Sequence, residues 1–247
     1  MSQTNKLIVA LDVNSAEKAR ELVNTLRGRV GMFKIGMQLF TSAGPDFVRE
    51  VVHSGERVFL DLKYHDIPNT VSGAAVEATR LGVSMFNIHA SGGGEMMQRT
   101  ADAVSQCAET EGIPRPSVLA VTLLTSSNSQ TLQQLGNTFA PAELVTRLAS
   151  LANVSGMDGV VASAQEIAAI RSVVKRPGFL IVTPGMRPAG SDCFDQKRTT
   201  GPREAVLAGA DYIVVGRPVL EAQDRERAVN EILAEIGSRS TSSSVSI

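Results

Sequence analysis

The sequence predicts a single-domain α/β protein folded as a closed (β/α)8 barrel, the TIM-barrel class. Three observations predict this fold. The chain contains eight short apolar runs, a segment of helical periodicity follows each run, and 247 residues is a typical length for one barrel domain. Because strands and helices alternate, we expect parallel strands that are connected by crossover helices.

The expected strands are continuous apolar runs, as is typical of parallel strands covered on both faces. They are 7–12 (LIVALD), 32–36 (MFKIG), 57–63 (RVFLDLK), 85–90 (MFNIHA), 117–125 (SVLAVTLLT), 159–163 (GVVAS), 179–185 (FLIVTPG) and 212–217 (YIVVGR). A doubly wound open sheet is the alternative, but that fold usually carries a glycine-rich phosphate loop after its first strand. The corresponding stretch here, LDVNSAEK, contains no glycine.

The expected helices carry apolar residues at helical spacing. They are 14–27, 41–54, 68–81, 95–110, 141–153, 164–174, 202–209 and 225–236. Three of them begin with a proline, which the first turn of a helix accepts, at Pro68, Pro141 and Pro202. We expect a catalytic barrel over 1–236 and a disordered, serine-rich tail over 237–247.

Composition excludes several classes of function. The formal net charge of -1 gives no general attraction to nucleic acids or anionic membranes, and a chain without tryptophan offers little for stacking bases. The N-terminus lacks the features of a signal peptide, and no apolar run approaches the ~20 residues that span a bilayer. Cys107 and Cys193 lack the spacing of a metal site, so we expect reduced thiols in a cytoplasmic protein.

Active sites of this barrel class lie at the carboxyl ends of the strands. The polar residues expected at these ends are Asp12, Lys34, Asp61, Lys63, His89, Thr122, Thr125, Ser163, Arg187 and Arg217. Charged residues are rarely buried unless they are paired. We therefore expect the four charged residues of the first three strands to face one another across the barrel mouth.

The stretch FLDLKYHDIPNT places Asp61, Lys63 and Asp66 within six residues. Asp61 and Lys63 share one face of a strand, and Lys34 from the neighbouring strand adds a second ammonium. An alternating array of lysines and aspartates would keep each member charged and would supply a positioned proton donor. The alternatives are a structural ion-pair network and a divalent cation on the carboxylates, which the two lysines disfavour. The histidines, none of which has the spacing of a zinc-binding pair, are His53, His65 and His89.

The seventh and eighth strands are followed by TPGMRP and VVGRP. Phosphate sites of this fold are often built from the loops after these two strands. Gly216 would let the backbone approach an anion, and Arg187 and Arg217 supply forked donors for phosphate oxygens. A plain Gly-Arg-Pro turn is the alternative. The long segment 186–201 is expected to close over the phosphate as a lid, and 126–138 could form a second flap.

Taken together, DLKYHDIPNTV, TPGMRPAGSDCFDQKR and VVGRP resemble the orotidine 5′-phosphate decarboxylase family. The resemblance extends from LIVALDV to VVGRPV, nearly the whole chain. It implies a barrel that acts as a homodimer without metal or organic cofactor. The implied reaction converts orotidine 5′-monophosphate to UMP and CO₂, the last step of de novo pyrimidine biosynthesis.

The resemblance also implies a role for each matching residue. Lys63 would protonate C6 of the pyrimidine, Asp61 would lie beside the departing carboxylate, and Lys34 and Asp66 would complete the charge array. The residues implied to contact substrate are Asp12 and Lys34 at the ribose, Thr122 at the pyrimidine, and Arg187, Gln196, Gly216 and Arg217 at the phosphate, with Gln196 also reaching the base. The residues implied to complete the partner's site are Asp66, Ile67 and Thr70.

Two other functions fit parts of the pattern. A sugar-phosphate decarboxylase or aldolase with the same barrel and a D-x-K-x-x-D motif would use Mg²⁺ and an enediolate, and would not need the loop that contains DQKR. A non-catalytic nucleotide-binding barrel would retain Gly216 and Arg217 but would not need Lys63 between two aspartates.

Overall fold

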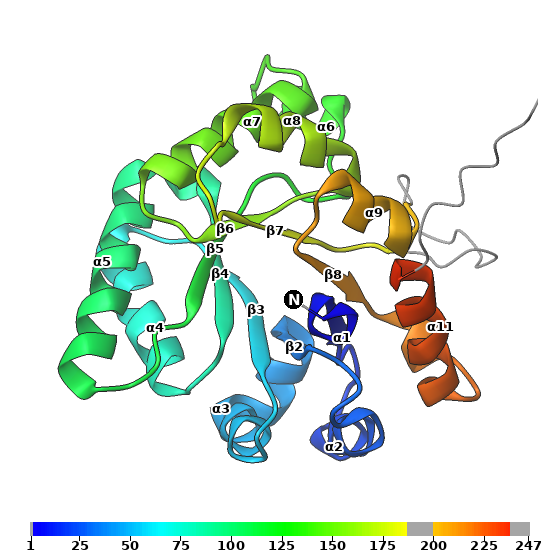
Figure 1. The fold of residues 1–247 in the computed structure, drawn as a ribbon. Coiled ribbons are helices and arrows are strands. Elements are labelled where there is room, and N and C mark those ends of the chain that lie inside the picture. The colour runs from blue at the N-terminus through cyan, green and yellow to red at the C-terminus, as the bar shows by residue number, and fades with distance from the viewer. Residues whose placement is uncertain (1, 187–199, 238–247) are drawn as a thin grey trace, which may run out of the picture.

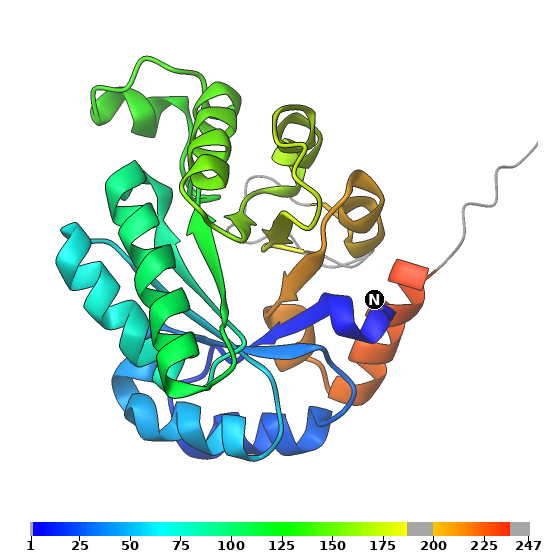
Figure 2. The ribbon, with the colours of Figure 1, turned by 60° about the vertical axis from the view of Figure 1, so that its left-hand side comes forward.

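The computed structural model describes residues 2–186 and 200–237, and these residues form a closed barrel of eight parallel strands (Figure 1). The strands follow one another around the barrel in chain order, and the last pairs with the first. Helices surround the barrel on its outside, as the two views in Figures 1 and 2 show. The predicted (β/α)8 barrel is confirmed.

All eight predicted strands are present. They are β1 (Leu7–Ala10), β2 (Met32–Gly36), β3 (Val58–Tyr64), β4 (Met85–His89), β5 (Ser117–Val121), β6 (Gly159–Val161), β7 (Leu180–Thr183) and β8 (Tyr212–Val215). Several end earlier than the apolar pattern predicts; β5, for example, ends at Val121 instead of residue 125. Lys34, Asp61, Lys63 and His89 lie within β2, β3 and β4, whereas Asp12, Thr122, Thr125, Ser163 and Arg217 follow the ends of their strands.

The eight predicted helical segments are also present. The main helices are α2 (Ala16–Leu26), α3 (Met37–His53), α4 (Pro68–Arg80), α5 (Gly94–Glu111), α7 (Pro141–Val154), α8 (Ile167–Val173), α9 (Pro202–Ala208) and α11 (Arg225–Gly237). Shorter helical segments, which the sequence pattern did not resolve, are α1 (Gln3–Lys6), η1 (Ala90–Gly92), α6 (Ser129–Gln134), η2 (Ala164–Glu166) and α10 (Arg217–Leu220). The predicted helix 164–174 is therefore divided between η2 and α8.

Local sequence signals explain where the helices begin. Ser15 precedes α2 and its side chain accepts a hydrogen bond from the backbone N–H of Lys18, as an N-cap does. The prolines at the starts of α4, α7 and α9 occupy first-turn positions, as predicted. Helix α3 begins earlier than predicted, directly after β2, and bends at Gly44, whose φ is 70°. Pro45 follows and lacks the N–H that an unbroken helix would need there.

The apolar core has two layers. The larger layer lies between the strands and the helices. The smaller layer, called here the inner cluster, fills the inside of the barrel and comprises Ile8, Ala10, Met32, Phe59, Met85, Leu119, Val182, Tyr212 and Val214. Because side chains alternate along a strand, the residues two positions after members of the inner cluster, toward the carboxyl end of each strand, also point inward. The inner cluster therefore forms an apolar floor beneath the polar residues of the mouth.

No helix in the described ranges is both long enough and apolar enough to cross a membrane. The expected division into a barrel over 1–236 and a tail over 237–247 stays a prediction, because 238–247 lies outside the described residues.

Candidate active site

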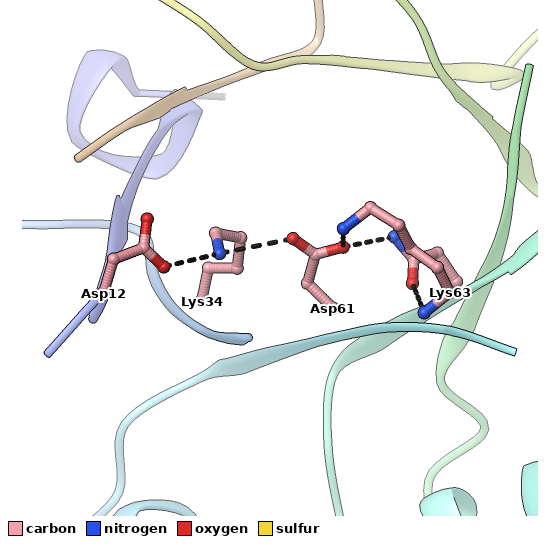
Figure 3. A network of polar contacts seen from close by, with 5 residues as sticks. Asp12, Lys34, Asp61 and Lys63 are labelled. Atoms are coloured by element: carbon pink, nitrogen blue, oxygen red, sulfur yellow. Dashed lines mark hydrogen bonds and ion pairs between the residues drawn. The ribbon is translucent and has the colours of Figure 1, made fainter. Parts of the chain in front are cut away.

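Four charged side chains form a continuous network at the barrel mouth (Figure 3). Lys34 Nζ lies 3.0 Å from Asp12 Oδ1 and 3.2 Å from Asp61 Oδ2. On the other side of the same carboxylate, Lys63 Nζ lies 2.6 Å from Asp61 Oδ1. The structure therefore brings together the four charged residues that the first three strands were predicted to present.

The network holds Lys34 and Asp61, its two central members, in their charged forms. Burial opposes the charge of Lys34, which is 9% exposed, but the carboxylates of Asp61 and Asp12 outweigh burial and raise its pKa. Burial would also raise the pKa of Asp61. The ammonium groups of Lys34 and Lys63, with hydrogen bonds from Lys63 and Asn87, overcome burial and lower that pKa instead. Asp61 and Lys34 are accordingly a carboxylate and an ammonium at neutral pH.

Strand β3 is irregular where it carries the network. Lys63 has φ 54° and is the one non-glycine residue with positive φ in the described part of the chain. The register with β4 shifts in the same place, because Leu60 pairs with Phe86 whereas Tyr64 pairs with Ile88. Strict alternation along an extended strand, which the sequence reasoning assumed, is therefore wrong for the backbone of Lys63, although its side chain does meet Asp61.

Asn87 fills the irregular part of the ladder. Its Oδ1 accepts a hydrogen bond of 2.8 Å from the backbone N–H of Lys63, and its Nδ2 donates one of 2.7 Å to Asp61 Oδ1. The sequence reasoning did not select this residue. A signal was present, because an amide in the apolar run MFNIH, two residues after Met85 and two before His89, shares their inward-facing parity.

Two adjoining cavities open beside the network. The first, of about 180 Å³, has Lys34, Asp61 and Lys63 on one side, and its other lining residues are Phe59, Val121, Leu123, Leu124, Thr125, Val161, Ala162, Pro184 and Val214. A pocket with ammonium groups at one wall and apolar side chains around it suits a flat, largely uncharged ring next to an anionic group.

The second cavity, of about 610 Å³, lies toward β8 and is more polar. Its lining includes Asp12, Gly216, Arg217 and Glu221, and it shares Lys34 and Asp61 with the first cavity. The two cavities therefore form one continuous mouth, with the charged network between an apolar end and an end that carries an arginine. Gly216 lies next to Asp12, because a β-carbon at position 216 would be in ordinary contact with Asp12 Oδ2 at 3.5 Å.

Thr122 lies beside the first cavity and is not among its lining residues. Its hydroxyl donates a hydrogen bond of 3.1 Å to the carbonyl oxygen of Val161, and 4% of the residue is exposed. Thr125, three residues further along the same loop, does line the cavity. Thr125 is therefore the threonine of VTLLT that lines the cavity, and the contact of Thr122 with a pyrimidine stays a prediction.

Asp66, Ile67 and Thr70 are exposed and do not join the network within one chain. Asp66 Oδ1 accepts a hydrogen bond of 2.6 Å from the backbone N–H of Ile67. The array of one chain therefore ends at Asp12 on one side and Lys63 on the other. Arg187 and Gln196, predicted for the phosphate, lie outside the described residues, as does most of the predicted lid.

Two histidines adjoin the lysine end of the network. The ring centroids of His65 and His89 lie 5.3 Å apart. Burial, together with His65 and Lys63, lowers the pKa of His89, so its imidazole is neutral at neutral pH. Within 2–186 and 200–237, no three His, Cys, Asp or Glu side chains are grouped so that they could hold a metal ion.

A closed parallel barrel with a lysine–aspartate network at its strand ends defines the chain as a TIM-barrel enzyme. Residues 5–232 match the Orotidine 5′-phosphate decarboxylase / HUMPS family, and the chain belongs to this family. The family and the enzyme class predicted from the sequence, a decarboxylase of orotidine 5′-phosphate, are thereby confirmed.

Comparison with individual proteins agrees. The chain is 52% identical over 231 residues to an orotidine 5′-phosphate decarboxylase of Geotalea daltonii, covering 94% of this chain and 95% of the relative. A decarboxylase of the same name from Geobacter sulfurreducens is 53% identical over 231 residues, with the same coverage of both chains. The crystal structure of the Lactobacillus acidophilus enzyme is similar with a TM-score of 0.83 and 36% identity, covering 94% of this chain and 99% of the other.

Proposed function

We propose that this chain decarboxylates orotidine 5′-monophosphate to UMP and CO₂ in pyrimidine biosynthesis, without a cofactor and with Lys63 as the proton donor. The observation that carries the proposal is the contact of 2.6 Å between Lys63 Nζ and Asp61 Oδ1 at the wall of a largely apolar cavity. Membership of the family supports the substrate.

The two cavities suit the two ends of this nucleotide. The pyrimidine ring fits the apolar cavity beside Lys63, where Thr125 offers a hydroxyl. The ribose hydroxyls fit next to Asp12, which lines the second cavity, and Lys34, which lines both cavities. The phosphate fits the second cavity at Gly216 and Arg217, and Arg187 and Gln196 from the predicted lid would complete its shell.

In the proposed reaction, the bond between C6 and the carboxylate breaks and its electron pair stays on C6. The ammonium of Lys63 stabilises this developing charge and then transfers one proton to C6, after which water restores the proton on Lys63. Asp61 places a negative charge beside the carboxylate of the bound substrate. That repulsion is relieved as CO₂ forms, so the network favours the transition state over the bound substrate.

Two chains are proposed to build each complete site. Ile67 is 66% exposed and Met37 is 56% exposed, and both follow neighbouring strands at the barrel mouth. Large apolar side chains exposed next to a catalytic mouth are typical of an interface with another chain. In a homodimer, Asp66, Ile67 and Thr70 would reach the partner's network and add the second aspartate near Lys63.

The loss of ultraviolet absorbance of orotidine 5′-monophosphate tests the proposal directly. We expect equal turnover with and without excess EDTA, and no measurable turnover by Lys63→Ala, which should still bind UMP. The matched control is Lys175→Ala, an exposed lysine that donates to the carbonyl oxygen of Arg171. Absent turnover by the unmodified chain would overturn the proposal, and inhibition by EDTA would favour the Mg²⁺-dependent sugar-phosphate chemistry instead.

A further inference from the structure

Asn87 is a fully buried amide that contacts both reactive residues of β3. It is 0% exposed, and it does not line either cavity of the mouth. We propose that Asn87 is a positioning residue for the decarboxylation, whose carboxamide fixes the Asp61 carboxylate and the Lys63 backbone relative to each other. The inference rests on the proposed function for its kinetic readout.

The backbone of β3 requires such a partner. Between the pair Leu60–Phe86 and the pair Tyr64–Ile88, three residues of β3 face the single residue Asn87 of β4. The bulged segment leaves the N–H of Lys63 without a ladder carbonyl, and Asn87 Oδ1 accepts it at 2.8 Å. A buried N–H that lost this acceptor would be costly, and Lys63 already adopts φ 54°, which residues with a side chain rarely adopt. The amide therefore supports the conformation that directs the lysine toward Asp61.

The carboxylate of Asp61 depends on the same amide. Its Oδ1 accepts from Lys63 Nζ at 2.6 Å and from Asn87 Nδ2 at 2.7 Å, while Lys34 Nζ lies 3.2 Å from its Oδ2. Asn87 is the donor among these three that does not titrate. When Lys63 has given its proton to C6, its attraction to Asp61 weakens, but the hydrogen bond from Asn87 does not change. The amide thus keeps the carboxylate in place for the next proton transfer.

Only a side chain that both donates and accepts satisfies these two partners. Aspartate at position 87 has the same shape but cannot donate when ionised, and it would place a second negative charge beside Asp61. Leucine has a similar shape and offers neither a donor nor an acceptor. Asn87→Asp therefore removes the hydrogen bond donated to Asp61 but keeps an acceptor for the N–H of Lys63, whereas Asn87→Leu removes both hydrogen bonds. Both substitutions change the packing little.

The experiment compares Asn87→Asp and Asn87→Leu with the unmodified chain, and kcat is normalised to the number of sites that bind UMP. We expect kcat to fall about 100-fold, because hydrogen bonds to charged groups are lost at the reacting centre. We expect KM to change less than about threefold, because Asn87 lies outside both cavities. The control is Thr100→Val, a fully buried polar residue of α5 that donates to the carbonyl oxygen of Met96.

A second readout separates positioning from general stability. The hydrogen bond from Asn87 favours ionised Asp61, so Asn87→Leu should raise the pKa of Asp61 and shift the acid limb of the kcat profile to higher pH. Normal kcat in correctly folded Asn87→Leu, or an unshifted acid limb, would overturn the inference. Carbon-13 NMR titration of Asp61 reports the same pKa rise without turnover. A chain that fails to decarboxylate the nucleotide but shows this rise would refute only the proposed function.

Discussion

A β-carbon at position 36 would lie 3.0 Å from the Nζ of Lys34 and 3.6 Å from Asp12 Oδ1. Gly36 is the last residue of β2, and it shares the inward parity of Lys34. The missing side chain leaves the room in which the ammonium lies between Asp12 and Asp61. Glycine at this position thus serves the charged network, and its φ of -93° would suit any residue.

Gly36→Ala should displace the Lys34 ammonium from Asp12 and weaken nucleotide binding. We expect KM to rise about tenfold, the loss of roughly one charge-assisted contact. In a Lys34→Ala background the same substitution should have almost no further effect, because the displaced group is already absent. Steady-state kinetics of the unmodified chain, the two single variants and the double variant measure the coupling between Gly36 and Lys34. An equal rise of KM in both backgrounds would contradict the explanation.

Mixing two inactive chains tests the shared site. Under subunit exchange, Lys63→Ala and Asp66→Ala should together recover about one quarter of the normal activity, because half of the dimers are hybrids and each has one intact site. The matched control mixes Lys63→Ala with Asp61→Ala. Those two groups are in contact within one chain, so no hybrid site is complete. Hybrids that are proven to form but stay inactive would rule out Asp66 acting on the partner.

His89 should make folding sensitive to acid. Burial, His65 and Lys63 lower its pKa in the folded protein, opposed by Asp61, whereas the unfolded group protonates near 6.5. The stability that neutral His89 confers is therefore complete above pH 6.5 and is lost as the pH falls through the lower, folded pKa. We expect His89→Gln to reduce the acid-side decline in the free energy of unfolding, measured by urea unfolding. His53→Gln, an exposed change on α3, should leave the decline unaltered.

Arg217 should matter for the phosphate and not for the nucleoside. We expect Arg217→Ala to weaken inhibition by UMP about 10- to 100-fold, as for a lost charge-assisted pair, and to change inhibition by uridine little. Arg20→Ala is the control, because Arg20 pairs with Glu50 between two outer helices. Equal weakening of both inhibitors would place the phosphate elsewhere.

The barrel fold, and the meeting of most charged residues at its mouth, could be predicted because both follow from the periodicity of side chains along the strands and helices. The apolar runs specify strands covered on two faces, and the inward parity of Lys34 and Asp61 brings them into contact. The left-handed backbone of Lys63 could not be predicted this way, because an apolar pattern contains no information about a local φ. Asn87 was missed for a related reason, since its importance depends on a bulge in the neighbouring strand.

The inner cluster closes the barrel beneath the charged network, and Phe59 and Val214 belong both to that cluster and to the cavity wall. The cavity is therefore blind-ended, with packed side chains where a channel would need to pass. In the proposed reaction, the CO₂ released at C6 has to leave through the same opening of the cavity by which the nucleotide entered. The order in which the two products depart is then decided at the rim of the mouth, where the bound UMP occupies the exit.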